Sequence, residues 1–283
     1  MTTMDLSEFD IVVRPGHTAT YETVTGSVAV LEGGQVTIGR VLDRGSVTVF
    51  SGGRAIIDEV CNWARVGVRG GQATIGKLSE QSRADVDDNG RLTIGEVCDC
   101  SNVDVDSGQA TIDQASSRSH VFIYSGGRAT IGKTSEQSSV HANGGQATIG
   151  EVCGDITNPS DCSWGARVRV DNGGRATIGK MSKRSQITVD NTLAAAEGNA
   201  RATIDEICDD VGVDLMGGGQ ATIGTASGNS SVYVGWLSQV SIAEVCGNSN
   251  VKVHDEGEAT IGKASDPSRI DHGGQVIFGK ASR

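Results

Sequence analysis

The sequence predicts an all-β protein, a single parallel β-solenoid of about thirteen coils of 18–19 residues each. Three observations predict this fold: a short phrase that recurs along the chain, the even spacing of one isoleucine within it, and the composition. The 283 residues include 40 glycines and only 3 prolines. Glycine is thus about twice as frequent as its usual share of roughly 7%, which supplies many tight corners. A collagen helix is excluded because the glycines follow no three-residue period.

The recurring phrase is Gly-Gly-Gln-Ala-Thr-Ile-Gly, or a close variant, and we call its isoleucine the anchor of a coil. Most anchors lie 18 or 19 residues apart, with longer intervals after Ile149 and Ile178. A unit this short cannot bury its own apolar face, so stacked copies must share one core. The thirteen anchors are Ile38, Ile57, Ile75, Ile94, Ile112, Ile131, Ile149, Ile178, Ile204, Ile223, Ile242, Ile261 and Phe278.

Each coil contains two alternating segments, a Val-x-Val segment such as Val47–Val49 and an anchor segment such as Ala73–Ile75. Alternation of period two predicts strands with one buried face. A Gly-Gly pair between the segments, as at Gly70 and Gly71, predicts a corner. A third apolar position, such as Val60, follows the anchor by three residues. We therefore predict three faces, parallel pairing about 4.8 Å apart, and a right-handed winding, since the six-residue period of left-handed solenoids is absent.

Stacking turns every position of the repeat into a column along the coils. The position two before the anchor is small or aliphatic and is predicted to be buried, whereas the threonine one before and the glutamine or arginine three before are predicted to face out. Two after the anchor the charge alternates, as from Lys77 to Glu96. Exposed pairs of this kind contribute only about 0–1 kcal/mol each, so this column is predicted to control register.

A cysteine or serine stands four residues after nearly every anchor. The cysteines of this column are two or more coils apart, roughly 9.6 Å at the spacing of stacked strands, which is too far for a disulfide. Cys162 stands apart in an insertion and could bridge Cys153. A reduced pair is expected instead if the chain stays inside a cell. The cysteines of the column are Cys61, Cys98, Cys153, Cys208 and Cys246.

The predicted organisation is an N-terminal cap or attachment segment at residues 1–27, followed by the solenoid at 28–283 with insertions at 154–166 and 190–198. The acidic start of the chain lacks the basic and apolar regions of a signal peptide. No stretch is long and apolar enough to predict a membrane span. The formal charge of −11 disfavours nucleic acid and anionic membranes as partners. We therefore expect neither nucleic acid nor a membrane as a partner. The expected location is a virion if the protein is encoded by a phage, and the cytoplasm otherwise.

One twelve-residue stretch matches the spacing of an EF-hand calcium loop. Asp85, Asp87 and Asn89 stand at positions 1, 3 and 5, Gly90 at position 6 and Glu96 at position 12. Every residue from Gly90 onward also occupies its ordinary place in the repeat, which explains the match without calcium. We therefore expect no metal ion and no cofactor, with Asp85, Asp87, Asn89 and Glu96 as the only metal candidate.

Catalysis is not expected, because the five histidines fall at unrelated positions of the repeat and no nucleophile with a matching base can be found. The threonine column resembles the threonine ranks with which some β-solenoid antifreeze proteins bind ice. The aromatic residues are scattered, so no platform for stacking sugars is predicted. The candidates for binding are therefore Trp164, Trp236, Thr74, Thr93, Thr111, Thr130 and Thr148.

The C-terminal coil is predicted to contact a partner end to end through Phe278 and Arg283. A bare solenoid end would expose unpaired N–H and C=O groups and a slice of core, and solenoids usually carry a polar capping unit at such an end. The expected occupant is a second copy of the chain or another protein of a larger assembly.

Over nearly its whole length the chain resembles short-coil β-solenoid proteins, among them phage fibres and tail or head appendages. That resemblance implies a non-catalytic structural or binding rod rather than an enzyme. A phage virion component is the first expectation, because it needs no secretion signal and profits from a rigid body. The alternatives are a cytoplasmic self-assembling scaffold and an ice-binding protein that uses the threonine column. An enzyme acting on polysaccharides comes last.

Overall fold

The computed structural model describes residues 6–154, 165–191, 199–265 and 267–279, and all regular structure within them is β-strand. The chain divides into two compact units, Met1–Thr130 and Ile131–Arg283, with the boundary inside β14 (Arg128–Thr134). Within these described ranges, no helix is long and apolar enough to cross a membrane.

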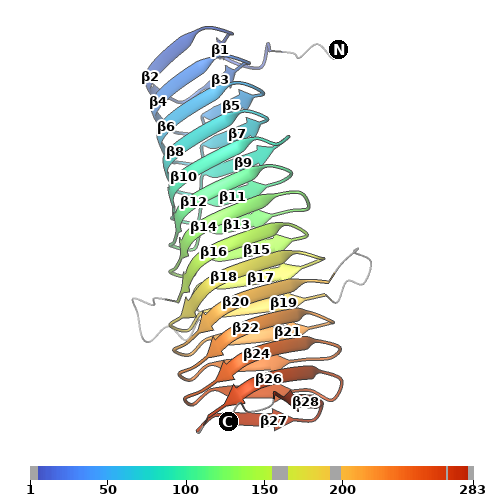
Figure 1. Ribbon diagram of the computed structural model, residues 1–283. Helices are drawn as coiled ribbons and strands as arrows, with labels where there is room; N and C mark the ends of the chain where they lie inside the picture. The colour runs from blue at the N-terminus through green and yellow to red at the C-terminus, as the bar shows by residue number, and fades with distance from the viewer. Residues whose placement is uncertain (1–5, 155–164, 192–198, 266, 280–283) are drawn as a thin grey trace. The chain divides into compact units, whose positions relative to one another are not determined.

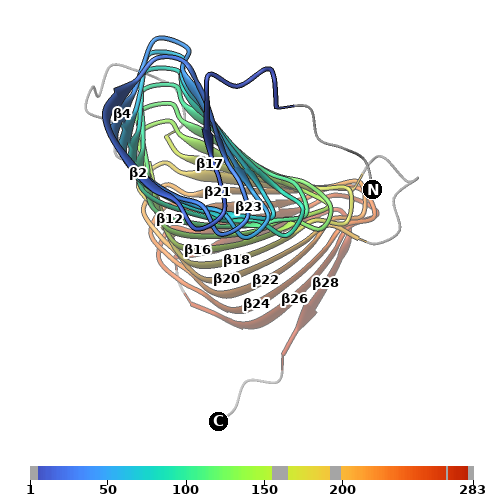
Figure 2. The same ribbon diagram turned by 90° about the horizontal axis from the view of Figure 1, so that it is seen from above.

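The first unit contains two parallel sheets whose strands alternate along the chain (Figure 1). In the view from above its coils, drawn in blue to green, lie over one another (Figure 2). The odd-numbered strands are β1 (Ile11–Val13), β3 (Ser27–Val30), β5 (Ser46–Phe50), β7 (Arg65–Arg69), β9 (Arg83–Asp87), β11 (Asn102–Val105) and β13 (His120–Ile123). The even-numbered strands are β2 (Thr18–Val24), β4 (Gln35–Val41), β6 (Arg54–Val60), β8 (Gln72–Leu78), β10 (Arg91–Val97) and β12 (Gln109–Ala115).

The second unit repeats this arrangement of two parallel sheets. Its odd-numbered strands are β15 (Ser139–Asn143), β17 (Arg167–Asp171), β19 (Gln186–Asp190), β21 (Gly212–Met216), β23 (Ser231–Val234), β25 (Asn250–Val253) and β27 (Arg269–His272). Its even-numbered strands are β16 (Gln146–Cys153), β18 (Arg175–Ser182), β20 (Arg201–Ile207), β22 (Gln220–Ala226), β24 (Gln239–Val245), β26 (Glu258–Ala264) and β28 (Gln275–Phe278).

Equal positions of successive coils lie opposite each other in both units. Ile94 pairs with Ile75 on one side and Ile112 on the other, and in the second unit Ile178 pairs with Ile149. The predicted parallel solenoid of about thirteen turns, about 19 residues apart and without helices, is thereby confirmed. Its handedness and number of faces stay predictions.

The anchor strands bend just after the anchor. In β10 exposed and buried residues alternate up to Ile94, and then two partly exposed residues intervene before Val97 is buried. The period of two is therefore broken at Gly95 and Glu96, so that Ile94 and Val97 both point into the core. This bend lets one strand contribute two of the three apolar positions that the sequence predicts.

The core consists of the anchor column, the column two before it and the paired valines. All anchors from Ile38 to Ile261 are at most 1% exposed, as predicted. Phe278 differs, because 56% of it is exposed. It lies on β28, the last strand of its sheet, and no described strand covers it.

The predicted N-terminal segment of residues 1–27 contains strands of its own. In β1, Ile11 pairs with Val28 of β3, and in β2, Tyr21 pairs with the anchor Ile38. The segment thus extends both sheets by one further coil ahead of the thirteen, and its role as a cap stays a prediction. The cores of the two predicted insertions, residues 155–164 and 192–198, lie outside the described residues.

The Gly-Gly phrase forms the predicted corner, and its two glycines have different tasks. The first adopts a positive φ, for example 87° at Gly218, which L-residues rarely adopt. The second lies against the preceding coil: a Cβ added to Gly219 would collide with the backbone carbonyl of Val189. The same close approach recurs at the second glycine of most corners, which explains why the phrase needs two glycines.

The charge column forms ion pairs between neighbouring coils, as its alternating sign predicts. Their shortest N–O distances run from 2.8 to 3.8 Å, and the side chains are largely exposed. Each pair therefore stabilises the fold little, and a role of the column in register stays a prediction. The pairs are Arg40–Glu59, Lys77–Glu96, Lys133–Glu151, Lys180–Glu206 and Lys263–Glu244.

Candidate functional site

The outer face of the odd-numbered sheet in the first unit carries a grid of polar and aromatic side chains. The inward positions of these strands are valines or small apolar residues, so the residues between them face out. Four such residues, Gly67, Asp85, Asp104 and Phe122, lie opposite one another on successive strands.

A pocket of about 480 Å³ opens on this face. Gly67 creates the hollow, because it places no side chain where its neighbours in the column carry Thr48 and Asp85. A Cβ added to Gly67 would meet no atom nearer than the Thr48 hydroxyl oxygen at 4.0 Å. The pocket is lined by Gly67, Arg69, Arg83, Asp85, Val86, Asp87, Asp104, Asp106 and Tyr124.

Arg83 joins two carboxylates of the pocket. Its Nε lies 2.6 Å from Oδ1 of Asp85, and its Nη2 lies 2.8 Å from Oδ2 of Asp104. Burial raises the pKa of Asp104 to about 6, and the neighbouring Asp85 adds to this rise while Arg83 opposes it. Burial also raises the pKa of Asp87, whose Oδ1 is buried without a hydrogen-bond partner. The negative charge of the carboxylates in the pocket is thus only partly neutralised by Arg83.

An aromatic row borders the pocket on β13. The rings of His120 and Phe122 stack with centroids 6.0 Å apart, and Phe122 and Tyr124 stack at 6.4 Å. Tyr124 lines the pocket and is 39% exposed. The expectation that the aromatic residues are scattered is therefore wrong for Phe122 and Tyr124. Their spacing of two residues, from within β13 to the residue just after it, is the sequence signal that places them on one face.

The four residues of the calcium-like stretch are not brought together. Asp85 and Asp87 point outward from β9, Asn89 lies in the following corner, and Glu96 belongs to β10 of the other sheet, where it pairs with Lys77 at 3.8 Å. Among the described residues, no group of three or more His, Cys, Asp or Glu side chains is arranged to hold a metal ion.

Replacing Asp104 by asparagine should change how stability depends on pH. The folded pKa of Asp104, about 6, lies above the value of 3.8 for a free carboxyl. The folded state therefore binds more protons between these values, and the stability contributed by this group falls as pH rises from about 4 to about 6. The Asp104→Asn variant lacks this loss. The free energy of unfolding of the variant minus that of the wild type should therefore increase by about 1–3 kcal/mol between pH 4 and pH 7. Urea unfolding of both proteins at both pH values measures this difference. The same difference in stability at pH 4 and at pH 7 would contradict the prediction.

The predicted threonine candidates are exposed in both units. Thr93 lies opposite Thr74 and Thr111 in the first unit, and Thr130 and Thr148 are exposed as well. Trp236 is 56% exposed, and its indole N–H donates to a carboxylate oxygen of Glu256. Trp164 and Arg283 lie outside the described residues.

In the second unit the threonine column lines the floor of an open pocket of about 480 Å³ on β20, β22, β24 and β26. The rank beside it is joined by hydrogen bonds: Gln220 donates to Gln239 at 3.2 Å, and Gln239 donates to Glu258 at 3.1 Å. The side chains of this neighbouring rank are thus tied together over three coils. The residues of this column that line the pocket are Thr203, Thr222, Ser241 and Thr260.

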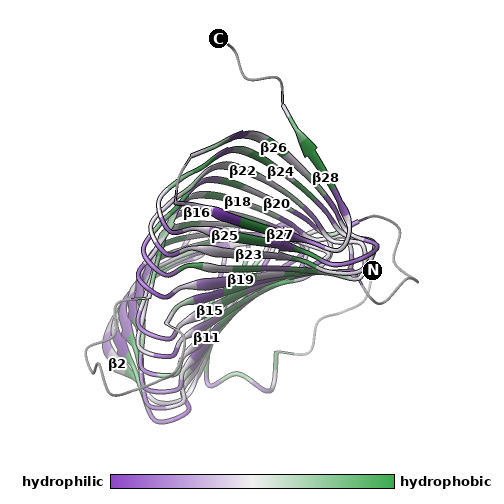
Figure 3. Ribbon diagram, turned by 90° about the horizontal axis from the view of Figure 1, so that it is seen from below, coloured by the Kyte–Doolittle hydropathy of each residue, from purple (hydrophilic) through white to green (hydrophobic). Residues whose placement is uncertain are grey.

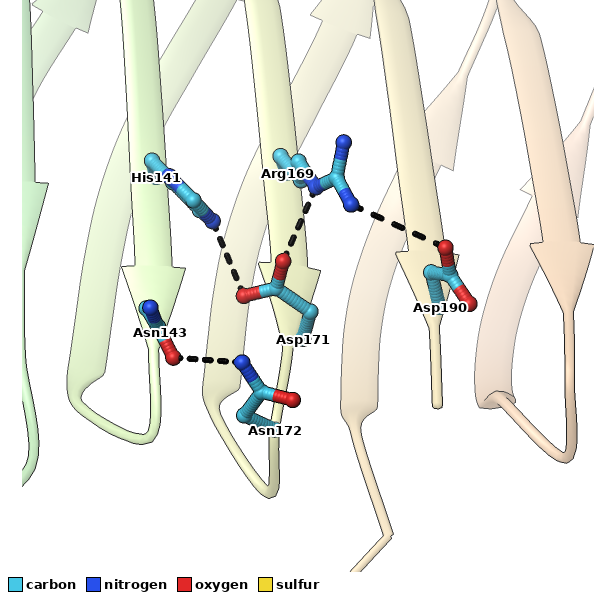
Figure 4. A network of polar contacts seen from close by, with 6 residues as sticks. All are labelled: His141, Asn143, Arg169, Asp171, Asn172 and Asp190. Atoms are coloured by element: carbon cyan, nitrogen blue, oxygen red, sulfur yellow. Dashed lines mark hydrogen bonds and ion pairs between the residues drawn. The ribbon is translucent and has the colours of Figure 1, made fainter. Parts of the chain in front are cut away.

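A second polar network lies on β15, β17 and β19 (Figure 4). The carboxylate of Asp171 lies 2.8 Å from Nε2 of His141 and 2.9 Å from Nε of Arg169, whose Nη2 is 3.7 Å from Asp190. The side chain of Asp171 is only 10% exposed. Because both of its oxygens are paired, the carboxylate fixes neighbouring strands to one another. Sequence reasoning missed this network, although His141 and Arg169 occupy equivalent positions of neighbouring coils.

The cysteine column consists of free thiols in the described part of the chain. Burial and the neighbouring Glu96 raise the pKa of Cys98 to about 12, and burial also raises the pKa of Cys61 and Cys208. These three side chains are therefore protonated at neutral pH and are poor nucleophiles. Cys162, the possible partner of Cys153, lies outside the described residues.

Comparison of the chain with protein-family models, with curated proteins and with solved structures gave no match. The functional interpretation therefore depends on the residues themselves.

Proposed function

We propose that this protein is a non-catalytic structural and binding solenoid that associates with other proteins or with copies of itself. The observation that carries the proposal is the in-register stacking of equal positions in both units. It gives continuous backbone ladders along the coils and presents each outward position as a repeated column. Such a surface suits a structural part that contacts extended or repeating partners.

Two buried groups, Asp171 and Cys98, support a role without catalysis. The carboxylate of Asp171 is paired on both sides, by His141 and Arg169. The thiol of Cys98, with a pKa of about 12, is not a nucleophile at neutral pH.

The setting that we propose first is a phage virion, as a tail or head appendage, and a cytoplasmic self-assembling scaffold is the alternative. A gene neighbourhood of capsid and tail genes supports the former, and filaments formed by the isolated chain support the latter. Ice binding is a further alternative, favoured by the exposed rank of Thr74, Thr93 and Thr111. Thermal hysteresis of the purified protein is its test.

The proposed contact with a partner is the C-terminal coil. The strands β27 and β28 are the last of their sheets, so each has one neighbour among the described strands. Ile277 and Phe278 on β28 are 51% and 56% exposed, and Figure 3 shows this strand as hydrophobic. An apolar strand with an unpaired edge favours pairing with another chain.

Replacing Phe278 by lysine should abolish self-association. A charge on the exposed strand opposes apolar contact, and the core is spared because Phe278 is already 56% exposed. The matched control is Thr260→Lys on the preceding strand of the same sheet, which should associate like the wild type. Sedimentation velocity over a range of concentrations measures this. A wild type that stays monomeric at high concentration, with no protein recovered in pull-down experiments, would overturn the proposed contact.

A further inference from the structure

We infer that the pocket on the outer face of β7, β9, β11 and β13 is a binding site for an uncharged saccharide. This inference goes beyond the proposed structural role, since it assigns a ligand class to one place on the surface. It follows from the shape of the pocket, the aromatic row at its border, and the type and charge of its polar groups.

The shape suits a short linear ligand that lies across the strands. The pocket extends from Gly67 on β7 to Tyr124 after β13, which is three strand spacings, or about 14 Å at 4.8 Å each. Gly67 deepens the floor at one end, and Tyr124 forms the other end. Because the floor is backbone held in two-sided pairing, the site is largely preformed.

The aromatic row offers a surface for one face of a sugar ring. Tyr124 is held in place by stacking on Phe122, with centroids 6.4 Å apart, and remains 39% exposed. The C–H groups of a pyranose face pack against such a ring, and the rigid stack lowers the entropy lost on binding. Burial and the nearby Asp104 raise the pKa of Tyr124, so its hydroxyl stays a hydrogen-bond donor at neutral pH.

The polar groups of the pocket are carboxylates and guanidinium groups, which can hydrogen-bond to adjacent hydroxyls of a sugar. Carboxylates accept two hydrogen bonds side by side, and a guanidinium donates two, so both are matched by neighbouring sugar hydroxyls. Arg83 holds the carboxylates of Asp85 and Asp104 at 2.6 and 2.8 Å, which fixes their orientation before a ligand arrives. Arg69 and Asp106 supply a further donor and acceptor at the edge.

The charge of the pocket decides against acidic sugars. Its lining contains four aspartates and two arginines, so carboxylates exceed guanidinium groups. An anionic ligand would meet net repulsion in a partly desolvated site. A bare metal ion is not favoured either, because Arg83 already occupies two of the carboxylates, and no suitable group of three ligands exists among the described residues.

The test is calorimetric titration of the purified full chain with three neutral probes, maltohexaose, cellohexaose and N-acetylchitohexaose, and with hexagalacturonate as the acidic probe. At least one neutral probe should bind with a Kd of millimolar or tighter, and the acidic probe should bind at least ten-fold more weakly. The Gly67→Gln variant fills the hollow and should weaken binding at least ten-fold. It should fold normally, since the atom nearest to a Cβ there is the Thr48 hydroxyl oxygen at 4.0 Å and the column neighbours Thr48 and Asp85 carry side chains.

Two further variants test the location of the site and the contribution of Tyr124 separately. Thr48→Gln places the same side chain one coil earlier, outside the pocket lining, and should bind like the wild type. Tyr124→Ala should lose roughly ten-fold in affinity, as expected for one stacking contact. The inference is overturned if no neutral probe binds, if hexagalacturonate binds more tightly, or if Gly67→Gln binds like the wild type. Each of these outcomes leaves the structural role untouched, because that role is tested at Phe278.

Discussion

Replacing Ile149 by aspartate should unfold the second unit or destabilise it by at least about 4 kcal/mol. Ile149 is 1% exposed and lies opposite the anchor Ile178 of the next coil. A carboxylate at this place would be taken out of water without a partner, among stacked aliphatic side chains. The loss of packing around the missing isoleucine adds to the cost. Thermal unfolding followed by circular dichroism measures the effect.

The matched control for Ile149→Asp is Thr148→Asp, one residue earlier on the same strand. Thr148 faces solvent, so the same charge there should change stability by less than about 1 kcal/mol. If the Ile149 variant melted within a degree of the wild type, the assignment of the anchor column to the core would be wrong. If the two variants were destabilised equally, the inward and outward faces of β16 would have been confused.

The second large effect is expected at the corner glycines. Changing Gly219 to alanine should cost about 2–4 kcal/mol, because the added methyl group collides with the carbonyl of Val189 and lies 3.1 Å from that of Met216. Both carbonyls belong to backbone, and Gly219 itself accepts the hydrogen bond of Gln239 at 3.0 Å. The strain therefore cannot be relieved by moving a single side chain.

Gly218→Ala is the control for this prediction. Gly218 has a φ of 87°, but a Cβ there meets nothing nearer than 3.9 Å. Its substitution therefore costs only the backbone strain of an L-residue, about 1–2 kcal/mol. Urea unfolding of both variants should rank Gly219→Ala as the less stable. The opposite order would show that the close approach of successive coils is not what selects the second glycine.

The repeat made most of the fold predictable. Even spacing of the anchors fixes the coil length, and the period of two within each segment fixes which side chains are buried. The same pattern explains the missed coil at the N-terminus, where Tyr21 stands in the register of an anchor. Because an aromatic residue replaces isoleucine and the Gly-Gly phrase is absent there, the repeat pattern does not indicate the strands of residues 11–24.

The pocket could not be predicted, because its residues belong to four coils and no short motif contains them. What places Gly67, Asp85 and Asp104 in one column is the pairing register of β7, β9 and β11. A sequence aligned on its anchors gives this register, but the Val-x-Val pattern itself indicates only which residues are buried. The calcium-like spacing includes Asp85 and Asp87 but neither Gly67 nor Asp104, so it does not indicate the pocket.

The proposed structural role and the pocket both require that equal positions of successive coils stack in register. Nitroxide spin labels at Thr93 and Thr111 test it directly, because these exposed residues lie opposite each other on β10 and β12. All 7 native cysteines are first replaced by serine, which already occupies the column position at Ser79 and Ser182.

Stacking in register predicts strong spin exchange between the labels at Thr93 and Thr111, about 4.8 Å apart at the backbone. Labels at Thr74 and Thr111, two coils and about 9.6 Å apart, should show dipolar broadening with little exchange. Equal spectra for the two pairs, or no exchange between Thr93 and Thr111, would contradict the register and with it the pocket.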